Sequence, residues 1–144
     1  MNLTDRFELT INGTPPDMVG AICEGFVCES LRVEGEPPAS ANTTYLKFHG
    51  SWYRLYFEFR CIFWRRFEEL IFPWEDETPW TDHVNITDEF EIVGQRLVSC
   101  AVSATDEGSE VAFAFENRLT VLIQDRNDRA SYSIADYTHE GKRN

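Results

Sequence analysis

The stretch from Trp52 to Arg66 constrains the fold of this chain more than any other. Seven of its fifteen residues are aromatic, and it contains no glycine or proline. Aromatic and β-branched side chains favour strands because they fill a pleated, half-buried surface, and aromatic side chains bury the largest area per residue. The stretch is too long for one average strand. It therefore predicts two strands at the centre of the core, Trp52–Phe57 and Ile62–Phe67, with a bend near Glu58–Arg60.

Shorter runs predict further antiparallel strands, because apolar and polar residues alternate in several of them. The runs expected to be strands are Arg6–Ile11, Phe26–Val33, Thr44–Phe48, Arg96–Ala104, Glu110–Phe115, Leu119–Ile123 and Ala130–Ile134. Turns are expected at 49–51, 106–108, 116–118 and 125–129, and loops at 34–42 and 73–91. The polar tail, 138–144, is expected to fray.

One short helix is expected near the N-terminus, over Met18–Cys23. Asp17 would lie near its N-cap and Gly25 past its end, although Gly20 weakens the pattern. The predicted fold class is therefore α+β, mainly β: a single domain over residues 1–144, built of antiparallel β-meanders with this short helix. A length of 144 residues is ordinary for one domain.

Two series of residues resemble each other along the chain. Val19-Gly20 is followed by strands and a turn, and Val93-Gly94 is followed by a similar order. The offset between them drifts from 74 residues to about 67. Either the chain consists of two similar β units, or the resemblance is the chance likeness of any two hairpins.

Charge is the most informative global property. The formal net charge is −12, which disfavours binding to nucleic acid phosphates or to an anionic membrane surface and favours a cationic partner or simple solubility. The imbalance is local: residues 68–116 contain thirteen Asp and Glu and one basic residue, Arg96. No secretory signal or membrane-length apolar run is visible, so we expect a cytoplasmic protein.

The sequence carries no strong catalytic or metal-binding signature. Four cysteines, Cys23, Cys28, Cys61 and Cys100, are expected to be reduced thiols in the cytosol. The histidines show no metal-ligand spacing, and Cys23 and Cys28 lack a second pair of ligands for zinc. We therefore expect no metal, no cofactor and no catalytic residue. An enzyme that uses Cys61 or His49 is the minority alternative.

The segment Pro73–Glu91 is the candidate site for a partner. It holds seven carboxylates and two tryptophans, with no lysine or arginine. Tryptophan is over-represented at the energetic centres of protein interfaces, and carboxylates suit a basic partner. The residues expected to bind the partner are Trp74, Glu75, Asp76, Glu77, Trp80, Asp82, Asp88 and Glu89.

Residues 43–135 resemble a known group of proteins in the order of their motifs: Tyr45-Leu46-Lys47-Phe48, Trp52-Tyr53-Arg54-Leu55, Ile62-Phe63-Trp64-Arg65 and Phe113-Ala114-Phe115-Glu116-Asn117. The chain resembles the small, acidic, β-rich immunity proteins of bacterial polymorphic-toxin and contact-dependent inhibition systems. The resemblance implies tight binding to a cognate toxin domain and assigns no contact residue. The acidic charge of the chain suits a basic toxin, such as a nuclease.

Two other classes of binding protein remain open. A β-rich domain could hold a small apolar ligand among its aromatic side chains, and a ligand retained through purification would favour that class. A general protein-interaction domain without a toxin link is the other. A toxin-like open reading frame directly upstream of the gene would favour immunity over both.

Overall fold

A computed structural model describes residues 10–32, 34–37, 39–58, 61–67, 81–86 and 90–136. For residues 67 and 81–85 it describes the backbone alone. The tail over 138–144 and most of the 73–91 segment lie outside these ranges.

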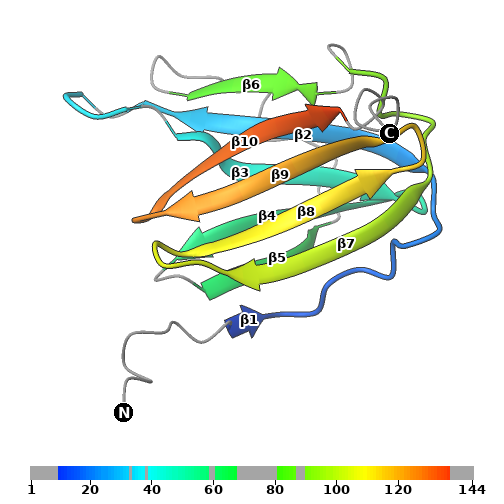
Figure 1. Ribbon diagram of the computed structural model, residues 1–144, viewed down its shortest axis with the longest axis horizontal. Helices are drawn as coiled ribbons and strands as arrows, with labels where there is room; N and C mark the ends of the chain where they lie inside the picture. Colours follow the sequence, from blue (N-terminus) through cyan, green and yellow to red (C-terminus); the bar gives the residue numbers. More distant parts are fainter. Residues whose placement is uncertain are drawn as a thin grey trace, which may run out of the picture.

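The described residues fold into two β-sheets that lie face to face (Figure 1). The strands are β1 (Thr10–Asn12), β2 (Cys23–Leu31), β3 (Ala39–Phe48), β4 (Ser51–Glu58), β5 (Cys61–Phe67), β6 (Thr81–Asn85), β7 (Leu97–Ala104), β8 (Ser109–Phe115), β9 (Leu119–Arg126) and β10 (Arg129–Asp136). One sheet has the order β1-β5-β4-β3-β2-β6 and the other the order β10-β9-β8-β7. All neighbours pair antiparallel except β1 and β5, which run parallel.

The core lies between the two sheets, where buried side chains of β2 to β5 meet those of β7 to β9. Phe113 in β8 contacts Phe26 of β2 edge-on, with ring centroids 5.4 Å apart. It also contacts Trp64 of β5, with centroids 6.4 Å apart. Such edge-to-face pairs add to the stabilisation from buried area. Phe113 thus joins the two sheets through one aromatic cluster.

The aromatic run forms two central strands as predicted. β4 ends at Glu58 and β5 begins at Cys61, and Leu55 lies opposite Trp64 in the register. Both of these side chains are buried, Leu55 at 0% and Trp64 at 2% exposure. The mainly β, antiparallel part of the predicted fold class is therefore confirmed.

Each sheet contains one four-stranded meander, β2 to β5 and β7 to β10. The turns that lead into them correspond at the offset of 74 residues: Gly20 has φ 92° and Gly94 has φ 91°. The segments that follow these turns also pair with each other, through the bridge between Ile22 and Arg96. The sequence distance between corresponding positions of the two meanders becomes smaller after these turns. The reason is that the connection from β2 to β3 is longer than the connection from β7 to β8.

The predicted N-terminal helix over Met18–Cys23 is wrong. Gly20 is in the left-handed region, which a helix interior does not allow. The backbone of this segment pairs with the start of β7 and the residues before it: Cys23 N–H donates to the carbonyl of Gln95 at 2.9 Å, and Leu97 N–H donates to that of Ala21 at 2.9 Å. The backbone groups of this segment therefore bond to residues far along the chain and not to one another within a helix.

Two expected loops contain strand. β3 begins at Ala39, inside the predicted 34–42 loop, and β6 lies inside the Pro73–Glu91 segment. β6 pairs with β2, from Val27 opposite Asn85 to Leu31 opposite Thr81. Of the predicted strand 6–11, the structure describes its last two residues, within β1.

Candidate functional site

Seven of the eight residues predicted to bind a partner lie outside the described ranges: Trp74, Glu75, Asp76, Glu77, Trp80, Asp88 and Glu89. The eighth, Asp82, lies in β6 with its backbone opposite Ser30 of β2. The structure therefore does not bring these residues together as a described surface, and their role stays a prediction.

The structure does place both ends of the acidic connection between β5 and β6, residues 68–80. It leaves β5 at Phe67, opposite Trp52, and rejoins the sheet at Thr81, opposite Leu31. Strands β4, β3 and β2 separate β5 from β6 in the sheet order. The connection is thus attached at both ends to one sheet, and binding segments held by a rigid scaffold are common in proteins.

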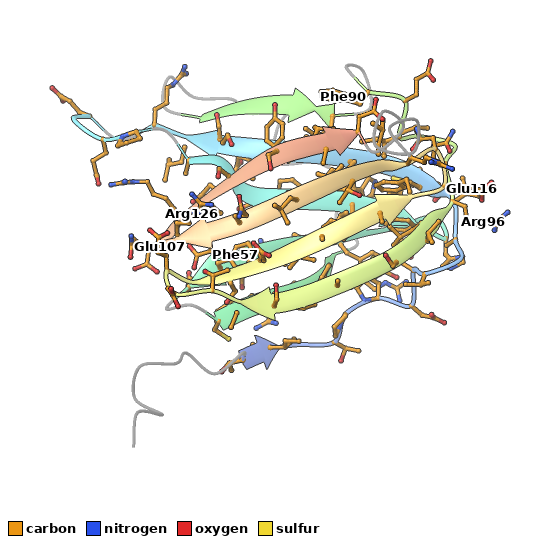
Figure 2. The ribbon with its side chains drawn as sticks, viewed as in Figure 1. Phe57, Phe90, Arg96, Glu107, Glu116 and Arg126 are labelled. Carbon is orange, nitrogen blue, oxygen red and sulfur yellow. The ribbon has the colours of Figure 1, made fainter. Side chains whose placement is uncertain are left out.

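The remaining acidic residues of the 68–116 stretch do not gather on one face. Glu107 lies at one end of the sandwich and Glu116 at the other (Figure 2). Glu116 forms an ion pair with Arg96, with 3.4 Å between Nε and Oε2. Glu107 and Glu116 therefore do not contribute to one common acidic face.

The outer face of the six-stranded sheet carries cations set over aromatic rings. Lys47 lies 5.9 Å from the Trp52 ring centroid. Arg54 lies 5.6 Å from that of Tyr56, and Arg65 lies 5.4 Å from that of Phe63. Tyr56 and Phe63 stack at 5.0 Å and 5°.

The middle of this aromatic and basic surface is closed to stacking by nucleic acid bases. Tyr45 and Val27, at its centre, are 3% and 7% exposed. Burial, with a smaller contribution from Glu29, raises the pKa of Tyr45 to about 12 although Arg54 opposes the shift. A base can stack only on a ring whose face is accessible, so Tyr45 does not serve as a stacking platform for single-stranded nucleic acid.

A cleft opens at one end of the sandwich, between the two sheets. It consists of two adjoining hollows of about 250 and 360 Å³ that share Asn42 and Asp128. We call it the mouth cleft, and its lining is Leu31, Glu36, Pro37, Ala39, Asn42, Phe57, Glu58, Asn127, Asp128 and Arg129. The lining thus includes acidic residues, amide residues and one aromatic residue.

The turn between β9 and β10 forms one wall of the mouth cleft. Its two central residues are left-handed, Asn127 at φ 54° and Asp128 at φ 64°. Asn and Asp are the non-glycine residues that tolerate this conformation best, and positive φ at both positions is the requirement of a type I′ hairpin. Asn127 N–H also donates to the carbonyl of Glu107 at 3.0 Å, which ties this turn to the turn between β7 and β8.

That turn could be predicted from the sequence, whereas the cleft could not. The lining comes from residues 31–58 and 127–129, and no local motif links them. The only local signal was the Asn127-Asp128 pair, which marks a tight turn without indicating a binding site.

The cysteine side chains have the burial expected of structural residues and not of reactive ones. Burial raises the pKa of Cys23 and of Cys28 to about 12 and that of Cys100 to about 11, so these groups stay protonated at neutral pH. Cys61 and His49 lie at opposite ends of β4, since Cys61 is opposite Glu58 and His49 precedes Ser51. A strand of this length spans about 20 Å or more, which is too far for a nucleophile and its base. Within the described residues, no three His, Cys, Asp or Glu side chains are grouped to hold a metal ion.

We expect the rates of alkylation of the four cysteines to follow their degree of burial. At pH 8 the folded protein should react first at the half-buried Cys61, more slowly at Cys100, and at Cys23 and Cys28 only when it unfolds. Iodoacetamide labelling followed by peptide mass spectrometry measures the order, and denatured, unreduced protein should give four labelled thiols. Rapid labelling of Cys28 in the fold, or no labelling after denaturation, would contradict this placement.

Comparisons with known proteins place the chain in no family. No family model matches it, and neither does any curated protein or any solved structure. In the part of the chain that the structure describes, no helix is long and apolar enough to cross a membrane.

Proposed function

We propose that this protein is a non-enzymatic binding protein that associates tightly with a basic protein in the bacterial cytoplasm, and that this partner is a toxin domain that it neutralises. The single observation that carries the proposal is the acidic connection 68–80. It holds five carboxylates, two tryptophans and no basic residue, and both of its ends are fixed in one sheet.

This connection supplies the electrostatic attraction in the proposal, because Glu107 and Glu116 lie at opposite ends of the sandwich. Complementary charge raises association rates by about 10–10³-fold, which suits an inhibitor that must capture its toxin quickly. Trp74 and Trp80 would supply the desolvated anchors that charge alone lacks. Asp82, Asp88 and Glu89 would extend the acidic surface beyond the connection.

Charge reversal at Glu75, Asp76 and Glu77 should test this role. The triple lysine variant is expected to slow association with the partner by at least tenfold at low salt and to flatten its salt dependence, while the fold survives. Stopped-flow association at several ionic strengths measures both. An unchanged association rate would remove the acidic connection from the interface.

A control variant with the same change in net charge is available elsewhere on the chain. Asp17, Glu34 and Asp106 are all exposed, and their triple reversal should alter association much less. Equal slowing by both variants would indicate an effect of total charge and not of a specific surface.

The geometry favours protein binding over the apolar-ligand alternative. The aromatic side chains between the sheets contact one another, as Phe26 and Phe113 do. The hollows at the mouth present Asn42, Glu58 and Asp128. An apolar ligand would leave these polar groups without partners at a cost in binding energy.

A further inference from the structure

We infer that the exposed edge of β7 is an interaction surface for a second copy of this chain, and that two copies pair their β7 strands antiparallel about a two-fold axis. This pairing does not depend on a toxin partner. Three properties of the edge support it: its open backbone, its lack of charged side chains and the opposite charges that flank it.

β7 is paired along one side. It is the last strand in the order β10-β9-β8-β7, and Figure 1 shows it at the margin of the four-stranded sheet. The start of its outer edge is closed, because Leu97 N–H donates to the carbonyl of Ala21 at 2.9 Å and the Leu97 carbonyl accepts from Gly20 N–H at 2.8 Å. Among the described residues, no backbone hydrogen bond reaches 98–104 from beyond β8. Alternate N–H and C=O groups of this stretch are therefore available to another strand.

The opposite edge of the same sheet is engaged within the chain. In β10, Tyr132 N–H donates to Ser40 Oγ of β3 at 3.1 Å. Two copies joined through β7 would form a sheet with a β10 strand at each end. A two-fold contact of this kind is closed, so the assembly stops at two copies.

β7 lacks the side chains that usually protect a free edge. Its sequence, LVSCAVSA, has no charged residue and no proline, whereas lysine, proline and inward-pointing charges commonly prevent pairing between edges. Val98 is 54% exposed, and the β-bulge between Leu97 and Ser99 affects the first residues of the strand alone. In a chain of net charge −12, an uncharged strand is a place where two like-charged copies can approach closely.

The two faces of β7 determine the register of the pair. Cys100 and Val102 pack against the core, while the residues that alternate with them are exposed. Residues directly opposite each other in an antiparallel pair lie on the same face. Pairing 98–104 with itself sets Ala101 opposite Ala101, Cys100 opposite Val102 and Ser99 opposite Ser103. Inward residues then meet inward residues, and the two four-stranded sheets become one continuous sheet.

The charges that flank β7 favour this antiparallel orientation. Arg96 precedes the strand and Asp106 follows it, and both are exposed. Figure 2 shows Arg96 and Glu107, the neighbour of Asp106, at opposite ends of the sandwich. Pairing centred on Ala101 brings Asp106 of one copy level with Arg96 of the second copy, and it does so at both ends of the paired strands. A parallel pairing would instead set like charges together.

Sedimentation equilibrium from about 10 µM to about 1 mM protein, a range that covers weak association, tests the pairing. We expect a reversible dimer, weak because pairing of two edges buries less area than a standard interface. Ala101→Lys places two ammonium groups opposite each other at the centre and should weaken the dimer at least tenfold. The matched control is Ala112→Lys, because Ala112 lies opposite Ala101 on the same face of β8. It adds the same charge one strand further from the edge and should leave the dimer intact.

Hydrogen–deuterium exchange of the parent protein locates the contact without any substitution. Exchange of the 98–104 amides should be slower at about 1 mM than at about 10 µM, while exchange in β10 should not change. Circular dichroism checks that both lysine variants fold. A monomer at every concentration, equal weakening by the two variants, or a dimer whose 98–104 amides exchange at an unchanged rate would each overturn the pairing.

Discussion

Replacing Trp64 with alanine is expected to lower the free energy of unfolding by about 3–5 kcal/mol, the usual range for truncating a large buried aromatic side chain. Trp64 is 2% exposed, and it contacts Phe113 of the other sheet at 6.4 Å and 79°. The substitution therefore removes a contact that joins the two layers and leaves a cavity between them. Urea denaturation followed by circular dichroism measures the loss.

Two control variants separate the layer contact from other effects of losing a tryptophan. Trp52→Ala, on the outer face, should cost clearly less because its side chain is half-buried. Trp64→Phe should also be mild: in the described part of the chain, no acceptor reaches the buried indole N–H, so the ring change removes an unsatisfied donor. A loss below about 1 kcal/mol for Trp64→Ala would show that the aromatic cluster does not hold the sheets together.

Replacing Gly108 with alanine is expected to destabilise the fold by about 1–3 kcal/mol or more, the cost of forcing an extra methyl group into a packed site. A Cβ atom at Gly108 would overlap the backbone carbonyl of Asp125. The clash is with backbone, so no side chain can rotate away from it. The turns at this end of the sandwich would have to separate, which would also widen the mouth cleft.

Thermal unfolding of the Gly108→Ala variant checks this expectation, with Asp106→Ala as the control in the same turn. The exposed Asp106 should tolerate alanine within about 0.5 kcal/mol. If Gly108→Ala were as stable as the parent protein, the close approach of the β7–β8 turn to β9 would be wrong.

The alternation of apolar and polar residues predicted the strands of the meanders well, because it directly indicates which face of a strand is buried. Val111, Phe113 and Phe115 alternate with smaller or polar residues and are all buried. The helix prediction failed because the segment around Gly20 is decided by pairing with residues about 75 positions away. No window of local sequence contains that information.

β6 was missed for a related reason. Its residues, Thr81–Asn85, lack an apolar period and follow two prolines, Pro73 and Pro79. They become a strand by pairing along the edge of β2. Edge strands depend on their neighbour more than on their own propensity.

The two candidate sites differ in how well they could be predicted from the sequence. The acidic connection is contiguous, so composition alone located it. The mouth cleft arises where the ends of β3 and β4 meet the β9–β10 turn, and Asn42 and Asp128 become neighbours only through the packing of two sheets. Alternation indicates which face is buried but does not indicate which strand ends meet.

The most direct test is to capture the partner from the native host on immobilised protein and to measure its association rate against ionic strength. We predict a basic protein whose association slows by at least tenfold between about 10 mM and 0.5 M salt, because attraction to the acidic connection is screened. An acidic partner, or a rate that does not change with salt, would contradict the proposed electrostatic capture.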